Sequence, residues 1–301
     1  MRLSRFLPVD PARIIRLAIV AVLPLLLCGC DLGVLDPKGP VGGSERLILI
    51  DSLAIMLVIV VPVILATAGF AYWFRASNAS RTFYLPEWEF NGTIELVVWS
   101  IPILVIVVLG GVAWYGSHEL DPYKPLPIAK GEKPLEVQAV SMDWKWLFIY
   151  PEQGVAAVNE LYIPTGKPVH FTIVSASVWN TFFVPQLGGM IYSMAGMTTQ
   201  MHLQADKSGI YQGLSGMFSG DGFSDMHYQV HAVNDDDFSK WVAGAKASSD
   251  ALDTAGYGKL AGVSGTAPVS TYKSVDPNLF AAIVGGTAPP QVGPPQVTNP
   301  P

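Results

Sequence analysis

The chain has 301 residues, of which 50% are hydrophobic and only 14% are charged, and its mean hydropathy is +0.37. This composition is too apolar for an ordinary soluble enzyme and indicates a membrane protein that carries a globular domain. The formal charge of −6 and the pI near 5.3 argue against a nucleic-acid-binding protein, which needs a basic patch.

Residues 1–29 have the layout of a targeting segment. An arginine-rich start precedes an apolar run, residues 17–27, that is too short to span a bilayer comfortably. The run ends in Leu27-Cys28-Gly29-Cys30, which resembles a bacterial lipoprotein signal. That resemblance implies cleavage after Gly29, a palmitate-type acyl chain on Cys30 and, from Asp31, retention in the inner membrane. The alternative is that Cys30 is a stray thiol in a leader.

Two long apolar runs follow the periplasmic segment expected at residues 30–46. Residues 52–74 and 96–115 are uncharged, and each reaches the ~20 residues that a transmembrane helix needs. We therefore expect a hairpin over residues 47–117, with spans at about 47–74 and 94–116. Lysines and arginines lie on both sides of the hairpin, so their distribution sets no orientation. A lipid on Cys30 would lie on the outer face, and two spans return the chain to that face.

Beyond a linker at residues 118–134, short runs rich in β-branched and aromatic residues alternate with Pro, Gly and Asp. About seven or eight strands between residues 135 and 234 predict a Greek-key β-sandwich. Residues 235–283 are expected to form a helical segment that starts at Asp235, because acidic residues favour a helix N-terminus. Residues 284–301 are rich in Pro and Gly and are expected to be disordered.

The sandwich motifs resemble those of one family. These motifs are Ser141-Met-Asp-Trp-Lys-Trp146, residues 178–185, residues 191–197 and residues 219–224. Together with the leader and the hairpin, they resemble subunit II of the haem–copper oxidases, and within it the cytochrome bo-type ubiquinol oxidase branch. The resemblance runs to about residue 280 and implies a cupredoxin-like outer domain.

The copper-bearing members of this family hold two copper ions with thiolate, imidazole and thioether ligands, which are the soft donors that select copper. The resemblance places the former ligand positions, in chain order, at Asn180, Leu214, Phe218, Gly222 and Met226 or its neighbour Asp225. Leu214 and Phe218 stand at the positions of two cysteines four residues apart. Only Met226 could ligate, so no metal and no cofactor are expected on this chain.

The remaining histidines and tryptophans have structural interpretations. His227 and His231 lie in a run that is typical of a strand, which separates them by about 13 Å, too far for one ion. His170 and His202 lie in strand-like runs without an evident partner and are expected at the surface. Trp144 and Trp146 are expected to pack in the sandwich or against a neighbouring subunit. In the copper-bearing relatives, an aromatic residue of this motif lies near the electron entry point.

Glu95 opens the second span on the cytoplasmic side. A carboxylate in a first helical turn gains ~0.3–1 kcal/mol from the helix dipole. The family resemblance implies a second role, at the entrance of a proton pathway into the catalytic subunit, since ionisable residues near the membrane mark such routes. The two roles are compatible.

The resemblance implies a non-redox subunit of a proton-pumping ubiquinol oxidase in the inner membrane of a bacterium. Its partners would be subunits I, III and IV and membrane lipid, with the haems and copper held by subunit I. A quinol dissolves in the bilayer and reaches subunit I directly, so the outer domain needs no metal relay. Two alternatives remain open at this point, a cytochrome c oxidase subunit II with degenerate ligands and a free-standing membrane lipoprotein that binds a ligand.

Overall fold

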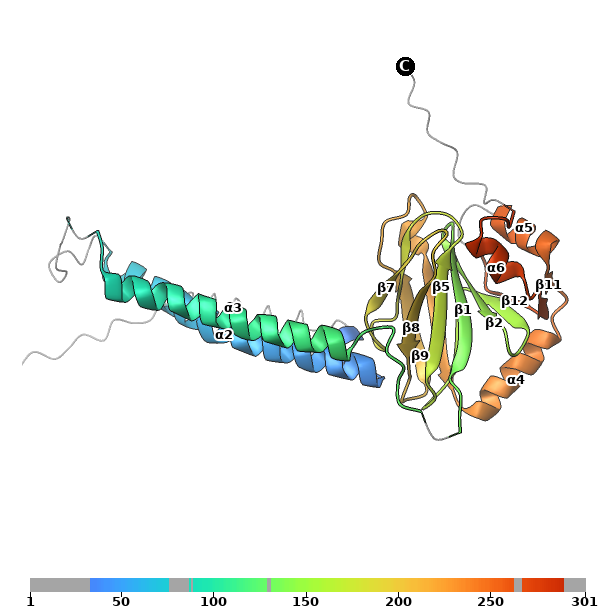
Figure 1. Cartoon of the computed structure of the whole chain (residues 1–301), viewed down its shortest axis with the longest axis horizontal. Coiled ribbons are helices and arrows are strands. Elements are labelled where there is room, and N and C mark those ends of the chain that lie inside the picture. Colours follow the sequence, from blue (N-terminus) through green and yellow to red (C-terminus); the bar gives the residue numbers. More distant parts are fainter. Residues whose placement is uncertain (1–32, 76–86, 88, 129–130, 263–266, 290–301) are drawn as a thin grey trace, which may run out of the picture.

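The computed structural model describes residues 33–75, 87, 89–128, 131–262 and 267–289. Two long helices project from a β-sandwich, and three short helices cover the opposite side of it (Figure 1). The expected membrane hairpin, sandwich and C-terminal helices are thus all present. The leader with Cys28 and Cys30 lies outside the described residues, as does the tail from residue 290 onward.

The hairpin consists of α2 (Pro40–Trp73) and α3 (Gly92–Glu119). Both are long and apolar enough to cross a membrane, and none of the most apolar window of either helix is buried within the described chain. Asn91 caps α3, because its side chain accepts hydrogen bonds from the backbone N–H groups of Thr93 and Ile94, both at 3.1 Å. The first helix begins at Pro40 rather than near residue 47. A proline at the first helical position has no N–H to lose and a φ already suited to a helix.

The sandwich contains more strands than the expected seven or eight. The strands are β1 (Leu135–Met142), β2 (Lys145–Tyr150), β3 (Val155–Val158), β4 (Glu160–Pro164), β5 (Val169–Ser175), β6 (Asn180–Phe183), β7 (Met190–Ser193), β8 (Thr199–Leu203), β9 (Gly209–Ser215) and β10 (His227–Val233). Together with β12 (Ser270–Tyr272) from the C-terminal segment, they form two sheets, with strand orders β12-β3-β2-β1-β5-β8 and β4-β10-β9-β6-β7. The four-residue strands β3, β6 and β7 carry too little periodicity to be recognised in sequence.

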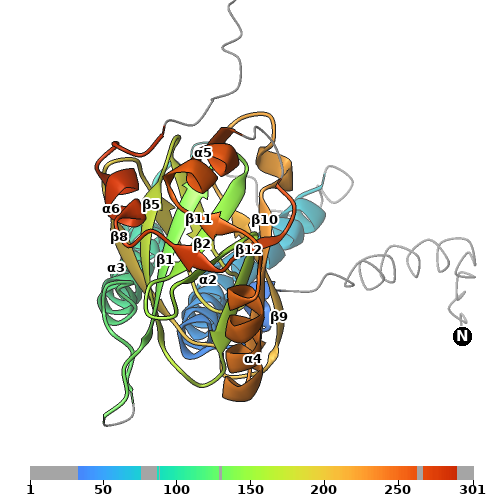
Figure 2. The same ribbon diagram turned by 90° about the vertical axis from the view of Figure 1, so that its right-hand side faces the viewer.

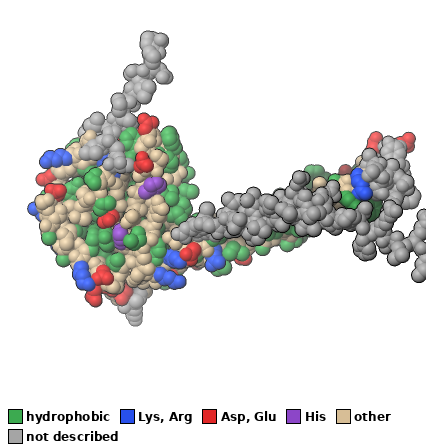
Figure 3. Space-filling view, turned by 180° about the vertical axis from the view of Figure 1, so that it is seen from behind, with side chains coloured by type: hydrophobic (Ala, Val, Ile, Leu, Met, Phe, Trp, Pro, Cys, Tyr) green, Lys and Arg blue, Asp and Glu red, His purple; other side chains and the backbone are tan. Residues whose placement is uncertain are grey.

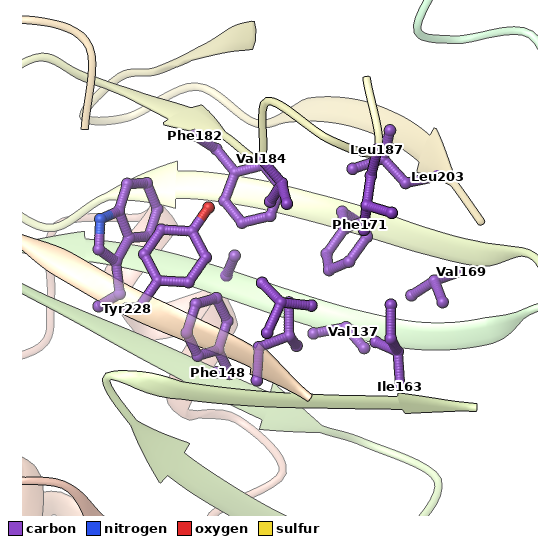
Figure 4. Close-up of a cluster of buried hydrophobic side chains, with 14 of the residues drawn as sticks. Val137, Phe148, Ile163, Val169, Phe171, Phe182, Val184, Leu187, Leu203 and Tyr228 are labelled. Carbon is purple, nitrogen blue, oxygen red and sulfur yellow. The ribbon is translucent and has the colours of Figure 1, made fainter. Parts of the chain in front are cut away.

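The core between the sheets is aromatic. Phe148, Phe182 and Tyr228 converge from three strands (Figure 4), and their ring centroids lie 5.2–6.4 Å apart. Trp146 lies 5.6 Å from both Phe182 and Tyr228 and is fully buried. Every second side chain of β1 and β5, at residues 135, 137 and 139 and at residues 169, 171 and 173, lies in this core, as expected for a packed sheet face.

The C-terminal segment is not purely helical, contrary to expectation. It contains α4 (Asp235–Lys246), α5 (Thr254–Gly262) and α6 (Leu279–Val284), but also β11 (Ala251–Leu252), β12 (Ser270–Tyr272) and β13 (Ser274–Val275). Strand β12 pairs with β3 and extends the six-stranded sheet. Strands β11 and β13 pair only with each other, and strands of two or three residues are too short for their own sequence to predict them.

Helices α5 and α6 lie over the outer face of the six-stranded sheet (Figure 2), whereas α4 packs against β3, β4 and β12, beside the core between the two sheets. Helix α4 starts at Asp235 as expected, where the Asn234 side chain accepts a hydrogen bond from Asp237 N–H at 2.8 Å. Its Trp241 stacks on Tyr162 at 4.6 Å and contacts Tyr150 at 4.9 Å. Buried residues of α5 and α6 form a second core with the outward side chains of β1 and β2.

Candidate functional site

A small polar cluster occupies the end of the sandwich where metal ligands were considered. The Asn180 side-chain N–H group donates to Met226 Sδ at 3.0 Å and to Ser219 Oγ at 3.3 Å. Asn180 and Met226 are each only 1% exposed. The structure therefore brings together two of the five positions singled out in sequence, one from β6 and one from the residue before β10.

The positions between them differ from the sequence expectation by one residue. Ser215, which accepts a hydrogen bond from Trp146 Nε1 at 3.0 Å, is buried on the inner face of β9. Leu214 lies on the other face of that strand, and Phe218 is 75% exposed. The two residues four apart that face the cluster are Ser215 and Ser219. Leu214 and Phe218 therefore do not face the cluster, because successive side chains of a strand point to opposite faces of the sheet.

Gly222 lies in the loop over Trp144 and does not reach the cluster. A Cβ at Gly222 would come within 2.4 Å of the Trp144 ring, so only glycine lets the loop approach. Trp144 itself has a φ of 56° in the β1–β2 turn, and it is 7% exposed. Both tryptophans of the motif thus pack within the domain, as predicted.

The cluster does not have the donor set of a copper centre. A side-chain amide that donates through its N–H group and two hydroxyls are hard, neutral groups, and a single thioether is a weak ligand. Among the described residues, no group of three or more His, Cys, Asp or Glu side chains could hold a metal ion. The role of the cluster is structural, since its hydrogen bonds join β6 to the loop between β9 and β10, and the bond between Trp146 and Ser215 joins β2 to β9.

The histidines differ in part from expectation. His170 and His202 were expected without partners, but their rings stack at 4.6 Å. His170 Nδ1 lies 2.7 Å from Glu136 Oε2, and His202 Nδ1 lies 3.1 Å from the Pro122 carbonyl oxygen in the linker. They face each other across the β5–β8 pair, a register that the sequence does not reveal. His227 and His231 lie in strand β10 as expected.

Glu95 is exposed in the first turn of α3, at the hairpin end farthest from the sandwich. Because Asn91 already caps this helix end, the carboxylate of Glu95 is not required as the cap. Cys30 lies outside the described residues, so the structure does not bear on its acylation.

The structure contains a buried pair of opposite charges that was not predicted from the sequence. Lys145, the first residue of β2, is fully buried, and Asp143, in the turn between β1 and β2, is 5% exposed. Asp143 Oδ1 accepts a hydrogen bond from Ser177 Oγ at 2.6 Å, which ties this turn to the loop after β5. Burial lowers the pKa of the Lys145 ammonium, and the charge of Asp143 opposes that shift. The sequence feature that could have indicated this pair is the presence of two opposite charges inside the otherwise apolar motif of residues 141–146.

Exposed apolar side chains gather beside the polar cluster. We call this set the rim patch: Val178, Trp179, Met190, Tyr192, Met197 and Phe218, which are 45–75% exposed. Trp179 and Tyr192 contact each other at 4.9 Å. Strand β7, which carries Met190 and Tyr192, lies on the side of the sandwich from which the hairpin projects (Figure 1). Figure 3 shows hydrophobic side chains along that side. Exposed apolar patches of this kind mark interaction surfaces.

Two family models match parts of the chain. Residues 105–233 match the family model "Cytochrome C oxidase subunit II, periplasmic domain", and residues 246–290 match "COX Aromatic Rich Motif". The solved periplasmic domain of subunit II of cytochrome oxidase (CoxB) of Bradyrhizobium japonicum is 24% identical and covers 40% of this chain and 96% of its own, with a TM-score of 0.37.

Two curated relatives match most of the chain. Ubiquinol oxidase subunit 2 of Acetobacter aceti is 50% identical over 260 residues, which are 86% of this chain and 84% of the relative. Cytochrome bo(3) ubiquinol oxidase subunit 2 of Pseudomonas aeruginosa is 47% identical over 260 residues, which are 86% and 78%. With the apolar hairpin and the cupredoxin-like sandwich in the order that the motifs predicted, this chain belongs to the family of ubiquinol oxidase subunit 2.

Proposed function

We propose that this chain is the non-redox subunit II of a terminal ubiquinol oxidase that reduces oxygen to water and moves protons outward. The observation that carries the proposal is the polar cluster of Asn180, Ser219 and Met226 at the end of a cupredoxin-like fold. A soluble electron donor that docks outside the membrane needs a metal relay in this domain. A ubiquinol dissolves in the bilayer and can pass electrons directly to the haems and copper of subunit I.

The chain itself supplies contact surface. The hairpin exposes its apolar side chains, and the rim patch extends that exposure onto the outer domain. An apolar surface on a helix pair can be covered by lipid, but the rim patch lies on the globular domain, and we infer that a protein partner covers it. Subunit I would be that partner, and the outer domain would cap and brace it. Subunits III and IV would complete the complex.

One purification experiment distinguishes this function from the two alternatives that the sequence leaves open, a degenerate cytochrome c oxidase subunit and a free-standing membrane lipoprotein. The full chain, carrying an affinity tag, would be extracted in mild detergent and purified with whatever accompanies it. We expect a haem spectrum and oxygen uptake that depends on ubiquinol. Oxygen uptake that depends on reduced cytochrome c would instead indicate a cytochrome c oxidase subunit. A chain recovered alone, without haem, would indicate a free-standing membrane lipoprotein.

Within this proposal, the mature chain begins at an acylated Cys30, as the leader motif implies. Acyl chains add ~0.8 kcal/mol per buried methylene, but two spans already anchor the chain. Blocking acylation should therefore leave the protein in the membrane. Mass spectrometry of the mature N-terminus tests this point, and an unmodified Cys30 or an intact leader would contradict it.

Glu95 would collect protons at the cytoplasmic entrance of the path into subunit I. We expect Glu95→Ala to lower turnover several-fold at unchanged haem content, and Glu95→Asp to restore part of it. Asn91→Ala serves as the matched control, since removing the helix cap costs about 1 kcal/mol without removing the carboxylate. If Asn91→Ala slowed turnover as much as Glu95→Ala, the role of Glu95 would be only to stabilise the helix end.

A further inference from the structure

A cavity of about 350 Å³ lies where the hairpin meets the sandwich. Its walls come from the start of α2, from residues 119–127 after α3, and from the edge strands β7 and β8. We call it the outer junction pocket. Its volume falls in the range of small-molecule sites, which are mostly apolar with a few placed polar groups.

The outer junction pocket is at the level of the lipid headgroups. Glu45 lies six residues outside Asp51, the charged residue that borders the first uncharged run, which corresponds to about 9 Å along a helix. Glu119 lies four residues beyond Tyr115, at the end of the second run, which corresponds to about 6 Å. The headgroup layer on each side of the hydrocarbon is roughly 5–8 Å thick. Glu119 therefore lies within that layer, and Glu45 lies at its outer border.

The pocket is preformed by backbone hydrogen bonds that fix the hairpin on the sandwich. Lys38 N–H donates to the Gln186 carbonyl at 2.7 Å, and Gly42 N–H donates to the Leu187 carbonyl at 3.0 Å. On the other side, His202 N–H donates to the Pro122 carbonyl at 3.2 Å. The start of α2 and the linker are thus held on opposite sides of the cavity, and a ligand would meet a formed site.

The lining combines apolar side chains with excess negative charge. Three carboxylates, Glu45, Glu119 and Asp121, line the cavity together with a single ammonium, Lys124. Lys124 pairs with Glu119 at 2.9 Å. Glu45 is half-buried between α2 and the sandwich and accepts a hydrogen bond from the backbone of Gly189. A cation is the complement of this charge, and the apolar walls favour a ligand that is also partly apolar.

We propose that the outer junction pocket binds the headgroup of an outer-leaflet aminophospholipid, such as phosphatidylethanolamine. Its ammonium has three N–H donors and would bond the carboxylate of Glu45, whereas its phosphate would lie near Lys124. Its acyl chains would follow the exposed apolar side chains of α2 and α3 into the bilayer. The lipid would fill the gap between the hairpin and the edge strands.

The test uses the full chain in nanodiscs that contain equal amounts of phosphatidylethanolamine and phosphatidylglycerol. After extraction in mild detergent, mass spectrometry would count the lipids that remain bound. We expect the unaltered chain to retain phosphatidylethanolamine in clear excess. Glu45→Gln should lower that excess by about tenfold, which corresponds to one charge-assisted hydrogen bond. Asp236→Asn, on the exposed start of α4, is the matched control and should change nothing.

The lipid ratio of the unaltered chain tests the proposal even if Glu45→Gln folds poorly. Equal retention of the two lipids would overturn it, and so would an excess that survives Glu45→Gln. Ser44→Phe, which places a ring in the cavity, should reduce retention of any lipid there. The assembled complex provides the last comparison, since a pocket filled by a segment of a partner subunit would retain no lipid and would also overturn the proposal.

Discussion

The hairpin and the sandwich bury their apolar residues in opposite ways. Trp99 in α3 is 68% exposed, whereas Trp146 in β2 is fully buried among other aromatic rings. The sandwich is therefore stabilised by its own core, and the hairpin depends on lipid and on partner subunits for its burial. The same residue type should contribute to folding in one region and to assembly in the other.

The pair Trp146→Ala and Trp99→Ala tests this contrast with the largest effect. Trp146→Ala should lower the free energy of unfolding of the outer domain by about 3–5 kcal/mol, the usual cost of removing a buried tryptophan. Trp99→Ala should change it by less than about 0.5 kcal/mol, as expected for a side chain away from the core. Denaturant unfolding of the full chain in micelles, followed by near-ultraviolet circular dichroism, measures both. Similar losses in the two variants would contradict the contrast.

The buried pair of Asp143 and Lys145 provides a second test of the contrast between hairpin and sandwich, because the sandwich core also buries charged side chains. Asp143→Leu should cost about 3 kcal/mol, because it leaves the Lys145 ammonium buried beside an apolar side chain. The double variant with Lys145→Met should recover much of that loss, and denaturant unfolding of all three variants measures this coupling. A double variant as unstable as Asp143→Leu would show that the pair does not act as a unit.

The hydrogen bonds of the polar cluster should contribute less to the free energy of unfolding than Trp146 or the buried charged pair does. Asn180→Ala removes the hydrogen bonds to Ser219 and Met226 and should cost about 1 kcal/mol, the typical net value of such bonds. Asn278→Ala is the matched control, because Asn278 is exposed and its side chain makes no cap hydrogen bond. Thermal unfolding would resolve the two variants. A loss several times larger for Asn180→Ala would mean that the cluster supports more than its own hydrogen bonds.

The smallest expected effect is a pH dependence of stability that arises from His202, where the linker after the hairpin meets the sandwich. Burial lowers the pKa of His202 below its ordinary value of 6.5, although the Pro122 carbonyl opposes the shift. The folded domain therefore favours neutral His202, so its stabilising contribution is complete above 6.5 and is lost as the pH falls through the lowered value. His202→Gln should flatten the acid limb of the unfolding temperature measured against pH. An unchanged acid limb would assign that limb to other groups.

The sequence was sufficient for elements that carry a strong local signal. The two apolar runs predicted α2 and α3, and the acidic run at Asp235 predicted the start of α4. The first turns of α2, residues 40–46, were not predicted, because they lie outside the apolar run. Strand β12 was missed because its pairing with β3 depends on a chain segment more than a hundred residues away.

Contacts within the site were harder to predict, because they depend on which residues of neighbouring strands lie opposite each other. Asn180 and Met226 lie together in the polar cluster, but the part played there by Ser215 and Ser219 was not predicted, because it depends on which side chains of β9 and its following loop face inward. The stacking of His170 on His202 depends on the register of β5 with β8. Such registers are set by tertiary packing, so they become visible only when both strands are in place.

The measurement that tests the account most directly is cysteine accessibility before and after assembly. Phe218→Cys places a thiol in the rim patch at a position 75% exposed, and Ile210→Cys places one at the other end of β9 at a position 65% exposed. Both should react with a water-soluble maleimide in the chain purified alone, with the unsubstituted chain as background. In the assembled oxidase, Phe218→Cys should be protected while Ile210→Cys still reacts. Equal reaction of Phe218→Cys in the free chain and in the complex would contradict a rim patch covered by the partner subunit.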